Sequence, residues 1–327
     1  MTLHRRTLLK SAVLPLAAGA GASPHAQDDY PTRPVTLVVP FPPGGVADVV
    51  GRPVAEAMGR FLRQPLVVEN KGGAGGGIGM AQVAKARPDG YTLLMALSSV
   101  VVLPEADRIL RRAPMFQLDQ LVPIARFSAD PTVLVVRADS PWKTYADFIA
   151  DARRRPGQLS FGSSGNYGTM HVPMEQLKAA TSTYLLHVPY TGAGPAVLAL
   201  LAGQVDALST GPSSVAQQIQ AGRLRALAHW GDGPLPGLPG VQSLKALGVP
   251  VGYSQWSGLF APAGTPEPVL ARLGEAARFA AQDPRAVQAL QSAGSSFQYL
   301  DAPQFARFVQ DEARTMAALV QRIGRVE

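Results

Sequence analysis

From residue 35 onwards, short apolar runs alternate with longer segments in which apolar residues recur at helical spacing. Apolar, β-branched runs at 35–40, 66–69 and 92–97 flank amphipathic segments at 47–62 and 78–85. Such runs are typical of strands, and the amphipathic segments are typical of helices. Strands that alternate with helices favour a parallel, doubly wound sheet. The pattern therefore predicts an α/β unit in this part of the chain.

The same alternation begins again after Pro123 and predicts a second α/β unit. Its expected strands are 124–127, 133–137, 159–162, 184–188, 205–209 and 224–228. Its expected helices are 145–155, 168–181, 195–201 and 215–221. The glycine- and proline-rich stretch 231–240 is expected to form a loop, and one more strand follows at 256–261. The remaining expected helices are 266–282, 285–293 and 303–323.

One strand with three helices is too little sheet for a third domain, so the C-terminal segment is expected to fold back onto the first unit. This arrangement predicts two domains and a hinge of two chain crossings, near 127–132 and 229–256. The first, discontinuous domain comprises residues 27–128 plus 231–327, and the second comprises 129–230. The length of 327 residues is sufficient for two such domains.

Residues 1–26 have the composition of an export signal. Arg5 and Arg6 precede a mildly apolar run at 11–22, and small residues follow. The run is shorter than the ~20 residues that a transmembrane helix needs. The arginine pair favours twin-arginine export, with an ordinary Sec signal as the alternative. We expect the mature protein to lie in the periplasm after cleavage near Ala22 or Ala26.

The composition excludes several kinds of chemistry. The chain has no cysteine, so it forms no disulfide, no thiolate nucleophile and no cysteine metal site. The net charge is +7, and it falls to +4 without residues 1–26, which carry three basic residues and no acidic one. A mildly basic protein attracts anions. The basic residues are scattered and are not interleaved with aromatic residues, so nucleic acid is not an expected partner.

Two segments, 37–48 and 159–171, share one design: an apolar strand runs into a glycine-rich turn, and a helix follows. The first N–H groups of a helix have no partner within the helix, and they lie at the positive end of its dipole. Each turn is therefore a candidate anion site. Two such sites in one chain suggest a cleft that holds a carboxylate from both sides.

The sequence motifs for catalysis are incomplete. The glycine-rich stretch 72–79 matches G-x-G-x-x-G in no register, and the chain lacks the phosphate-binding G-x-x-x-x-G-K-[ST] motif. Residues 162–166 nearly match the nucleophile elbow G-x-S-x-G, but Asn166 replaces its last glycine. Asp206 and His229 would complete a Ser, Asp, His order, so an exported hydrolase is a minor alternative. With these motifs incomplete, no catalytic residue and no cofactor are expected. No metal site is expected either, because the histidines lack metal-ligand spacing.

The segment Phe41-Pro-Pro-Gly-Gly-Val-Ala-Asp48 resembles the substrate-binding proteins of tripartite tricarboxylate transporters, the Bug-type periplasmic receptors. Further segments resemble signatures of the same family, in the family's order: 88–93, 188–192 continuing to 203–206, 219–225 and 256–266. The resemblance implies two doubly wound α/β domains with a hinge, a fold like that of type II periplasmic binding proteins, without catalysis. It also implies a small carboxylate ligand and delivery to a membrane transporter of one large and one small multispanning protein. A monomer is expected.

In that family, backbone amides and ordered waters at the two strand-turn-helix segments hold the ligand carboxylate. The resemblance implies that the ligand contacts in the first domain are Phe41, Pro43, Gly44, Gly45 and Asp48. In the second domain it implies Ser163, Ser164, Gly165, Asn166, Gly168, Thr169 and His171, with Tyr190, Thr191 and Gly192 at the rim. Asp48 would either position a water or only stabilise the helix N-terminus, and Asn166 and Thr169 have the same alternative as caps.

The chain departs from the family at three positions that bear on the ligand. Val46 and Ala47 lack the hydroxyl groups that relatives often carry there, and Tyr167 replaces a common glycine. The pocket is therefore expected to be less polar, which weakens the case for citrate and leaves room for a monocarboxylate or an aromatic acid. The sequence does not decide between these and a di- or tricarboxylate or an amino acid. The same fold would also serve a periplasmic ligand sensor that docks on a signalling protein, and the sequence alone does not separate the two roles.

Overall fold

The computed structural model describes residues 30–235, 237–295 and 297–325. The export signal predicted at 1–26, with its two candidate cleavage sites and its export route, lies outside the described residues and stays a prediction. Within the described part of the chain, no helix combines the length and the apolar composition that crossing a membrane requires.

The first sheet, as far as the chain is described, has five strands in the order β2-β1-β3-β10-β4. β1 pairs in parallel with β2 and β3, whereas β10 is antiparallel to both of its neighbours. The strands are β1 (Val35–Val39), β2 (Leu66–Asn70), β3 (Thr92–Leu97), β4 (Leu121–Pro131) and β10 (Ser254–Pro262). The helices connected to them are α1 (Val46–Leu62), α2 (Gly77–Ala84), α3 (Leu103–Ile109), α8 (Glu267–Gln282), α9 (Pro284–Ser292) and α10 (Ala302–Ile323).

The second sheet has the order β7-β6-β8-β5-β9 among the described residues. β6 is parallel to β7 and β8, whereas β5 is antiparallel to β8 and β9. The strands are β5 (Val133–Arg137), β6 (Ser160–Ser163), β7 (Leu186–Pro189), β8 (Ala207–Thr210) and β9 (Leu224–His229). The helices are α4 (Tyr145–Arg154), α5 (Val172–Thr181), α6 (Ala193–Leu201) and α7 (Ala216–Gln220). Short 3₁₀ turns lie at η1 (Ala74–Gly76), η2 (Ser98–Val101), η3 (Leu118–Gln120) and η4 (Pro212–Ser214).

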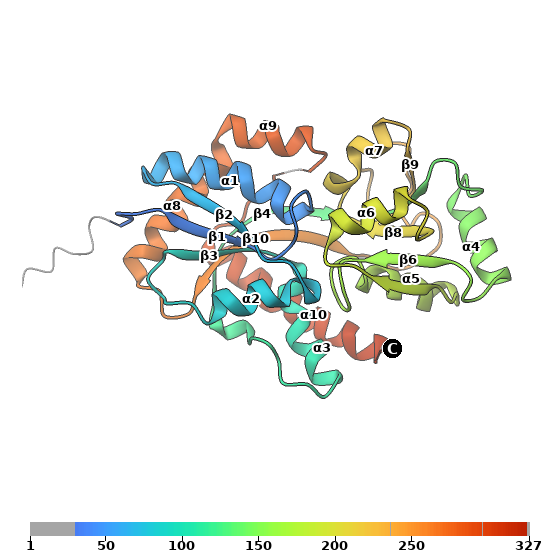
Figure 1. The fold of residues 1–327 in the computed structure, drawn as a ribbon, viewed down its shortest axis with the longest axis horizontal. Coiled ribbons are helices and arrows are strands. Elements are labelled where there is room, and N and C mark those ends of the chain that lie inside the picture. Colours follow the sequence, from blue (N-terminus) through green and yellow to red (C-terminus); the bar gives the residue numbers. More distant parts are fainter. Residues whose placement is uncertain (1–29, 236, 296, 326–327) are drawn as a thin grey trace, which may run out of the picture.

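Both sheets have the same topology, and in each one the reversed strand arrives from the other sheet. β4 leads through Thr132 into β5, and β10 returns from the second sheet to lie between β3 and β4 (Figure 1). The predicted two-domain α/β fold is confirmed. The sheets are mixed rather than wholly parallel, because each crossing strand enters its new sheet against the direction of the others. The predicted domain limits, 27–128 plus 231–327 and 129–230, stay a prediction.

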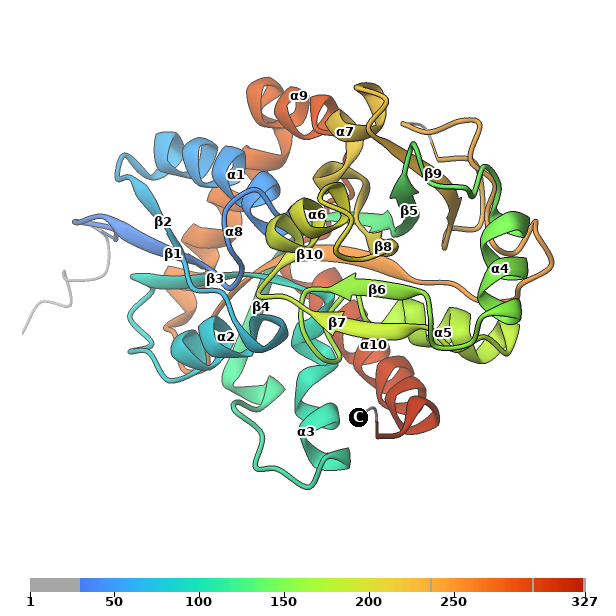
Figure 2. The same ribbon diagram turned by 45° about the vertical axis from the view of Figure 1, so that its right-hand side comes forward.

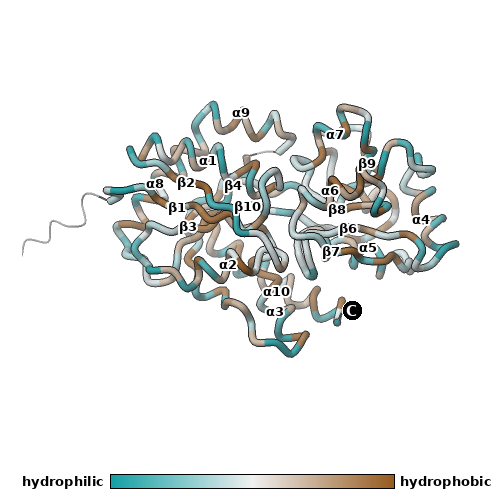
Figure 3. The backbone as a smooth tube through the Cα atoms, in the orientation of Figure 1, coloured by the Kyte–Doolittle hydropathy of each residue, from teal (hydrophilic) through white to brown (hydrophobic). Residues whose placement is uncertain are grey.

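The apolar positions that predict the strands and helices are the positions that the fold buries. Val35, Leu37 and Val39 in β1 are fully buried, because helices cover the sheet. Along α10 the buried residues follow the helical period; they are Phe305, Val309, Met316, Leu319 and Val320. Figure 3 shows the apolar residues concentrated in the strands at the centre of each half of the molecule.

Helix α10 is anchored on the first sheet and reaches the second domain. The ring of Phe305 is buried and lies edge-on to Trp256 of β10, with 5.6 Å between the ring centroids. A Cβ atom added at Gly258 would lie 2.2 Å from Phe305 Cζ, so only glycine at this position lets the helix lie so close to β10. Figures 1 and 2 both show the C-terminal end of α10 close to α5.

Two elements differ from their predicted limits by more than two residues, and helix α3 was not predicted. Helix α5 begins at Val172 rather than at residue 168, because Gly165 and Tyr167 have left-handed backbones, with φ of 118° and 56°. Strand β4 continues through Pro123, where the sequence pattern predicts a boundary between segments. β4 is at the edge of its sheet, where a proline without an N–H group does not break a shared ladder.

Candidate functional site

The turn between β1 and α1 directs the N-terminal end of α1 toward the second domain. Gly44 is left-handed, with a φ of 79°, and this allows the chain to turn directly into the helix. Gly45 is the N-cap, and no side chain caps the helix in the described structure. A Cβ atom at Gly45 would lie 3.7 Å from Ala193 Cβ of α6. The uncapped N–H groups of α1 therefore begin at the boundary between the domains.

The turn between β6 and α5 is held by hydrogen bonds within the turn. Ser163 Oγ accepts a hydrogen bond from the N–H of Gly165 at 3.1 Å, and the N–H of Gly168 donates to the carbonyl of Gly165 at 3.0 Å. The helix that follows has His171 at its N-cap, with no side-chain cap among the described residues. Thr169 and Met170, which directly precede this helix, lie at the boundary between the domains.

A third helix N-terminus lies beside the first two. Helix α6 begins after Gly192, without a side-chain cap in the described part of the chain. The N–H of Tyr190 donates to the carbonyl of Ser163 at 2.9 Å, which ties this segment to the second turn. The sequence predicted two anion sites and placed Thr191 and Gly192 only at the rim. The structure adds the N-terminus of α6, so three positive helix ends point toward one region.

The two domains touch at positions where a side chain would keep them apart. A Cβ atom at Gly192 would lie 2.4 Å from Pro42 Cδ, and one at Gly165 would lie 2.7 Å from the backbone nitrogen of Gly75. Real Cβ atoms do not lie this close to other heavy atoms, so a side chain at either position would force the atoms at this contact to move. The domains are therefore in direct contact across the cleft, an arrangement called closed below.

A small enclosed cavity lies between the domains at the three helix ends. Its volume is about 10 Å³, which is room for about one water molecule. Its lining residues come from both domains and are Phe41, Gly45, Val46, Leu97, Ser164, Thr169, Met170, Ala193 and Gln255.

Two polar atoms at this cavity lack partners. Ser164 Oγ and Gln255 Oε1 are buried and have no hydrogen-bond partner among the described residues. Gln255 Nε2 donates to Thr169 Oγ1 at 2.8 Å, so the amide is held in place from the second domain. A buried hydroxyl without a partner costs free energy, and a carboxylate oxygen of a ligand would accept a hydrogen bond from it.

Asp48 does not line this cavity; it holds the first turn. Asp48 Oδ2 accepts hydrogen bonds from the N–H of Gly44 and from Arg52 Nε, both at 3.0 Å. Asn70 Nδ2 donates to Asp48 Oδ1 at 2.9 Å and to the carbonyl of Phe41 at 2.9 Å. Burial acts to raise the pKa of Asp48, but the hydrogen bonds from Arg52, Gly44 and Asn70 outweigh burial and hold the pKa below its ordinary value. Of the two predicted roles, this geometry supports the structural one.

Beneath the second turn lies a stack of two histidines. The rings of His171 and His187 are stacked, with centroids 4.1 Å apart. His171 Nδ1 accepts a hydrogen bond from the N–H of Tyr167 at 2.9 Å, and His187 Nε2 lies 2.6 Å from Ser163 Oγ. Burial and the neighbouring His171 lower the pKa of His187 to about 3, so His187 is neutral at physiological pH. The stack fixes the turn from below.

These contacts do not assemble a hydrolase site. The serine of the elbow-like segment is Ser164, and its Oγ has no hydrogen-bond partner among the described residues. The neighbouring Ser163 has its Oγ 2.6 Å from His187 Nε2 and donates to the carbonyl of Gly165. The two other residues of the predicted triad order form hydrogen bonds with backbone groups. Asp206 accepts a hydrogen bond from the N–H of Ser160, and His229 accepts one from the N–H of Gly231. Within the described ranges, no three acidic or histidine side chains are grouped to hold a metal ion.

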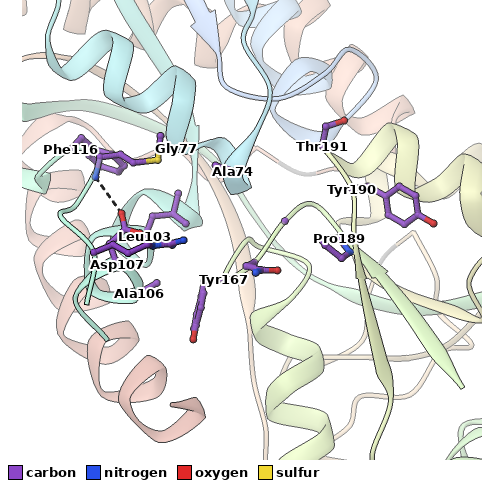
Figure 4. A pocket seen from close by; sticks show the side chains of 14 residues that line it. Ala74, Gly77, Leu103, Ala106, Asp107, Phe116, Tyr167, Pro189, Tyr190 and Thr191 are labelled. Atoms are coloured by element: carbon purple, nitrogen blue, oxygen red, sulfur yellow. Dashed lines mark hydrogen bonds and ion pairs between the residues drawn. The ribbon is translucent and has the colours of Figure 1, made fainter. Parts of the chain in front are cut away.

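Two larger cavities flank the central one. The first has a volume of about 570 Å³, and Figure 4 shows Tyr190 and Thr191 on one side of it, with Leu103 and Asp107 on the other. Tyr167 lies between the two sides, and Gly165 and Asn166 also line this cavity. The second has a volume of about 560 Å³ and is lined by the turn after β1 and by α6. Its residues include Pro42, Pro43, Gly44, Gly194, Pro195 and Leu198.

The predicted site residues thus occupy different places. At the central cavity lie Phe41, Gly45, Ser164 and Thr169. In the flanking cavities lie Pro43, Gly44, Gly165, Asn166, Tyr190 and Thr191. Away from all three cavity linings, or packed beneath the turns, are Asp48, Ser163, Gly168, His171 and Gly192. The prediction missed Val46, Leu97, Met170, Ala193 and Gln255 as lining residues. A local signal existed for Gln255, which directly precedes the 256–266 signature.

The family model described as the tripartite tricarboxylate transporter family receptor matches residues 50–325. A relative named BugT, from Bordetella pertussis, is 34% identical over 310 residues, which cover 94% of this chain and 95% of BugT.

Three solved structures are similar over the whole fold. MatC from Rhodopseudomonas palustris, with bound malate, is 29% identical with a TM-score of 0.84, covering 89% of this chain and 100% of MatC. A second R. palustris protein, with adipate, is 27% identical with a TM-score of 0.85, covering 90% of this chain and 98% of the other. A ligand-free TctC solute-binding protein from Polaromonas is 30% identical with a TM-score of 0.65, covering 90% of this chain and 99% of the other.

Proposed function

This chain belongs to the tripartite tricarboxylate transporter receptor family, and we propose that it encloses one small carboxylate between its two domains in the periplasm. One observation carries the proposal. The N-termini of α1, α5 and α6 converge on an enclosed cavity at which the buried Ser164 Oγ has no partner among the described residues. Positive helix ends and a free hydroxyl donor favour an anionic group with acceptor oxygens.

The lining of the cavity bears on the ligand class. The polar atoms come from Ser164, Thr169 and Gln255, whereas most other lining side chains are apolar: Phe41, Val46, Leu97, Met170 and Ala193. Such a site suits a carboxylate head with an apolar chain better than a ligand with many hydroxyl groups. Two structural relatives hold malate and adipate. We therefore propose a linear mono- or dicarboxylate, with an adipate-like acid favoured over citrate.

We propose that capture occurs by domain closure. The central cavity has room for about one water, so a ligand of several carbon atoms enters only when the domains separate. The similarity to the malate- and adipate-bound structures, at TM-scores of 0.84 and 0.85, exceeds that to the ligand-free structure, at 0.65, although the identities are comparable. This difference supports the interpretation that the described arrangement is the closed one.

The members of this family are receptors of a membrane transporter. We therefore propose that this protein passes its ligand to a membrane transporter of one large and one small multispanning protein. We also propose that it acts as a monomer.

The capture step is tested by calorimetry with adipate and its neutral analogue adipamide. We expect one-to-one binding of adipate, and at least about 10-fold weaker binding of adipamide, because the helix ends reward the negative charge. Equal affinities would contradict a site built for an anion, and malate would be the second acid to try.

A further inference from the structure

We propose that Tyr167 is a positioning residue for ligand capture, because its hydroxyl group fastens the ligand-binding turn of the second domain to the end of α10 on the first domain. The Tyr167 hydroxyl donates a hydrogen bond to the carbonyl of Gly324 at 2.7 Å. The side chain is 1% exposed. In Figure 4 its ring points away from Tyr190 and Thr191. The expected effect of this bond on ligand affinity rests on the proposed function, whereas its effect on domain closure does not.

The backbone at Tyr167 argues that the side chain has a role. Its φ is 56°, in the left-handed region that bulky residues rarely adopt and that glycine adopts freely. A tyrosine here is strained, and strain at a binding turn persists only when surrounding contacts determine the conformation. These contacts include the hydrogen bond to Gly324, the bond from the Tyr167 N–H to His171 Nδ1 and the edge-on contact of the two rings.

The acceptor side of the bond is a fixed part of the first domain. Gly324 is the C-cap of α10, and α10 is packed on β10 through Phe305 and Trp256. The end of the helix is also tied to α3, because Gln321 Nε2 donates to Glu105 Oε1 at 3.1 Å and Arg325 Nε donates to the carbonyl of Ile109 at 3.2 Å. The carbonyl of Gly324 is therefore fixed by contacts within the first domain.

The donor side is a fixed part of the ligand-binding turn. Ser164 and Thr169, which line the central cavity, lie within five residues of Tyr167 on either side. His171 holds the Tyr167 backbone, and Gly165 is in contact with Gly75 of the first domain. The hydroxyl bond thus joins the two domains and exists only while they are closed. A contact made only in the closed state raises the population of that state and slows ligand release.

The chain offers a matched control for the hydroxyl group. The Tyr30 hydroxyl also donates to a glycine carbonyl, that of Gly90, at 2.6 Å, but both residues belong to the first domain. Removing either hydroxyl deletes one tyrosine-to-carbonyl bond. Only removal at Tyr167 deletes a bond between domains, so Tyr167→Phe and Tyr30→Phe separate a positioning role from a general loss of stability.

The first measurement is adipate binding, with malate as a second probe, by stopped-flow kinetics and calorimetry. We expect Tyr167→Phe to weaken affinity by about 2- to 13-fold, the range of one neutral hydrogen bond, with most of the change in the dissociation rate. Tyr30→Phe should leave both rate constants unchanged. Equal rate constants in wild type and Tyr167→Phe would overturn the proposal.

The second measurement needs no ligand, so it separates this proposal from the proposed function. Because the chain has no cysteine, cysteines introduced at the exposed positions Gln82 on α2 and Ala150 on α4 carry spin labels at single sites in each domain. Pulsed electron resonance should show a larger fraction of long distances in ligand-free Tyr167→Phe than in wild type or Tyr30→Phe. If wild type binds neither acid but this shift is seen, the proposed role of the Tyr167 hydroxyl in domain closure stands and the proposed ligand class fails. Identical distance distributions in all three proteins would refute the proposal that the Tyr167 hydroxyl holds the domains closed.

Discussion

Gln255 of β10 donates a hydrogen bond from Nε2 to Thr169 Oγ1 at 2.8 Å, and this bond joins the reversed strand of the first sheet to the turn between β6 and α5 in the second domain. The other atom of the same amide, Oε1, has no partner among the described residues. The amide therefore holds the closed arrangement on one side and presents a polar atom to the central cavity on the other.

Replacement of this amide should damage binding more than folding. In Gln255→Met the chain length is kept, but the contact with Thr169 and the polar atom at the cavity are lost. We expect adipate affinity, measured by calorimetry, to fall by about 2- to 13-fold, the range of one neutral hydrogen bond, because the bond to Thr169 between the domains is lost. The control is Gln176→Met. Gln176 Nε2 also donates one hydrogen bond, to the carbonyl of Gly252, and its buried Oε1 has no partner in the described structure, but it lies outside the central cavity. An equal loss in both variants would count against a role for Gln255 at the ligand.

Gly192→Ala should act as a wedge between the domains. The added Cβ would lie 2.4 Å from Pro42 Cδ, and because the φ of Gly192 is 171°, the backbone itself accepts alanine without strain. We expect the affinity for adipate to fall by at least about 10-fold while the melting temperature without ligand stays within about 2 °C of wild type. Small-angle scattering should show that saturating adipate shrinks the radius of gyration of wild type but not of the variant.

The matched control for this wedge is Gly233→Ala, because a Cβ atom at Gly233 would meet no atom within 4 Å. It should behave like wild type in both measurements. A Gly192→Ala variant that closes normally on adipate would show that the described contact between Gly192 and Pro42 is not part of the liganded state.

The stacked histidines predict a pH dependence of stability. In the folded protein, burial and His171 lower the pKa of His187 from 6.5 to about 3. The unfolded chain therefore binds a proton at this residue below pH 6.5 while the folded protein does not. The stabilisation is fully present above pH 6.5, and it is lost progressively as the pH falls toward 3. For one group, the free energy of unfolding falls by at most about 1.4 kcal/mol per pH unit.

Urea unfolding at pH 5, 6 and 7 measures this effect. His187→Asn keeps a hydrogen-bonding side chain beside Ser163 but does not titrate, so its stability should fall less between pH 7 and pH 5 than that of wild type. The comparison is made as a difference because His229, whose pKa is also lowered by burial, contributes equally to both proteins. Parallel curves for the two proteins would mean that His187 does not titrate as described.

The local parts of this protein are readable from its sequence. The helix expected at 303–323 is α10 at Ala302–Ile323, because a one-sided apolar pattern at helical spacing identifies a helix wherever it packs. The two strand-turn-helix segments are recognisable because glycine-rich turns between apolar strands and helices depend on neighbouring residues. The resemblance to the receptor family, which these turns carry, implied Phe41, Gly45, Ser164 and Thr169 as ligand contacts, and these four residues line the central cavity.

Other features were decided by the tertiary structure alone. The direction of β5 and β10 follows from the two crossings between domains, which no local pattern encodes. Asp48 holds its turn partly because Asn70, at the end of a different strand, reaches it. Leu97, Ala193 and Gln255 line the cavity because the folded chain brings β3, α6 and β10 together from positions far apart in sequence. Periodicity and turn chemistry act over a few residues, so the sequence by itself determined the elements and their turns. Which side chains meet across the cleft depends on long-range packing, so only the folded structure decided the composition of the site.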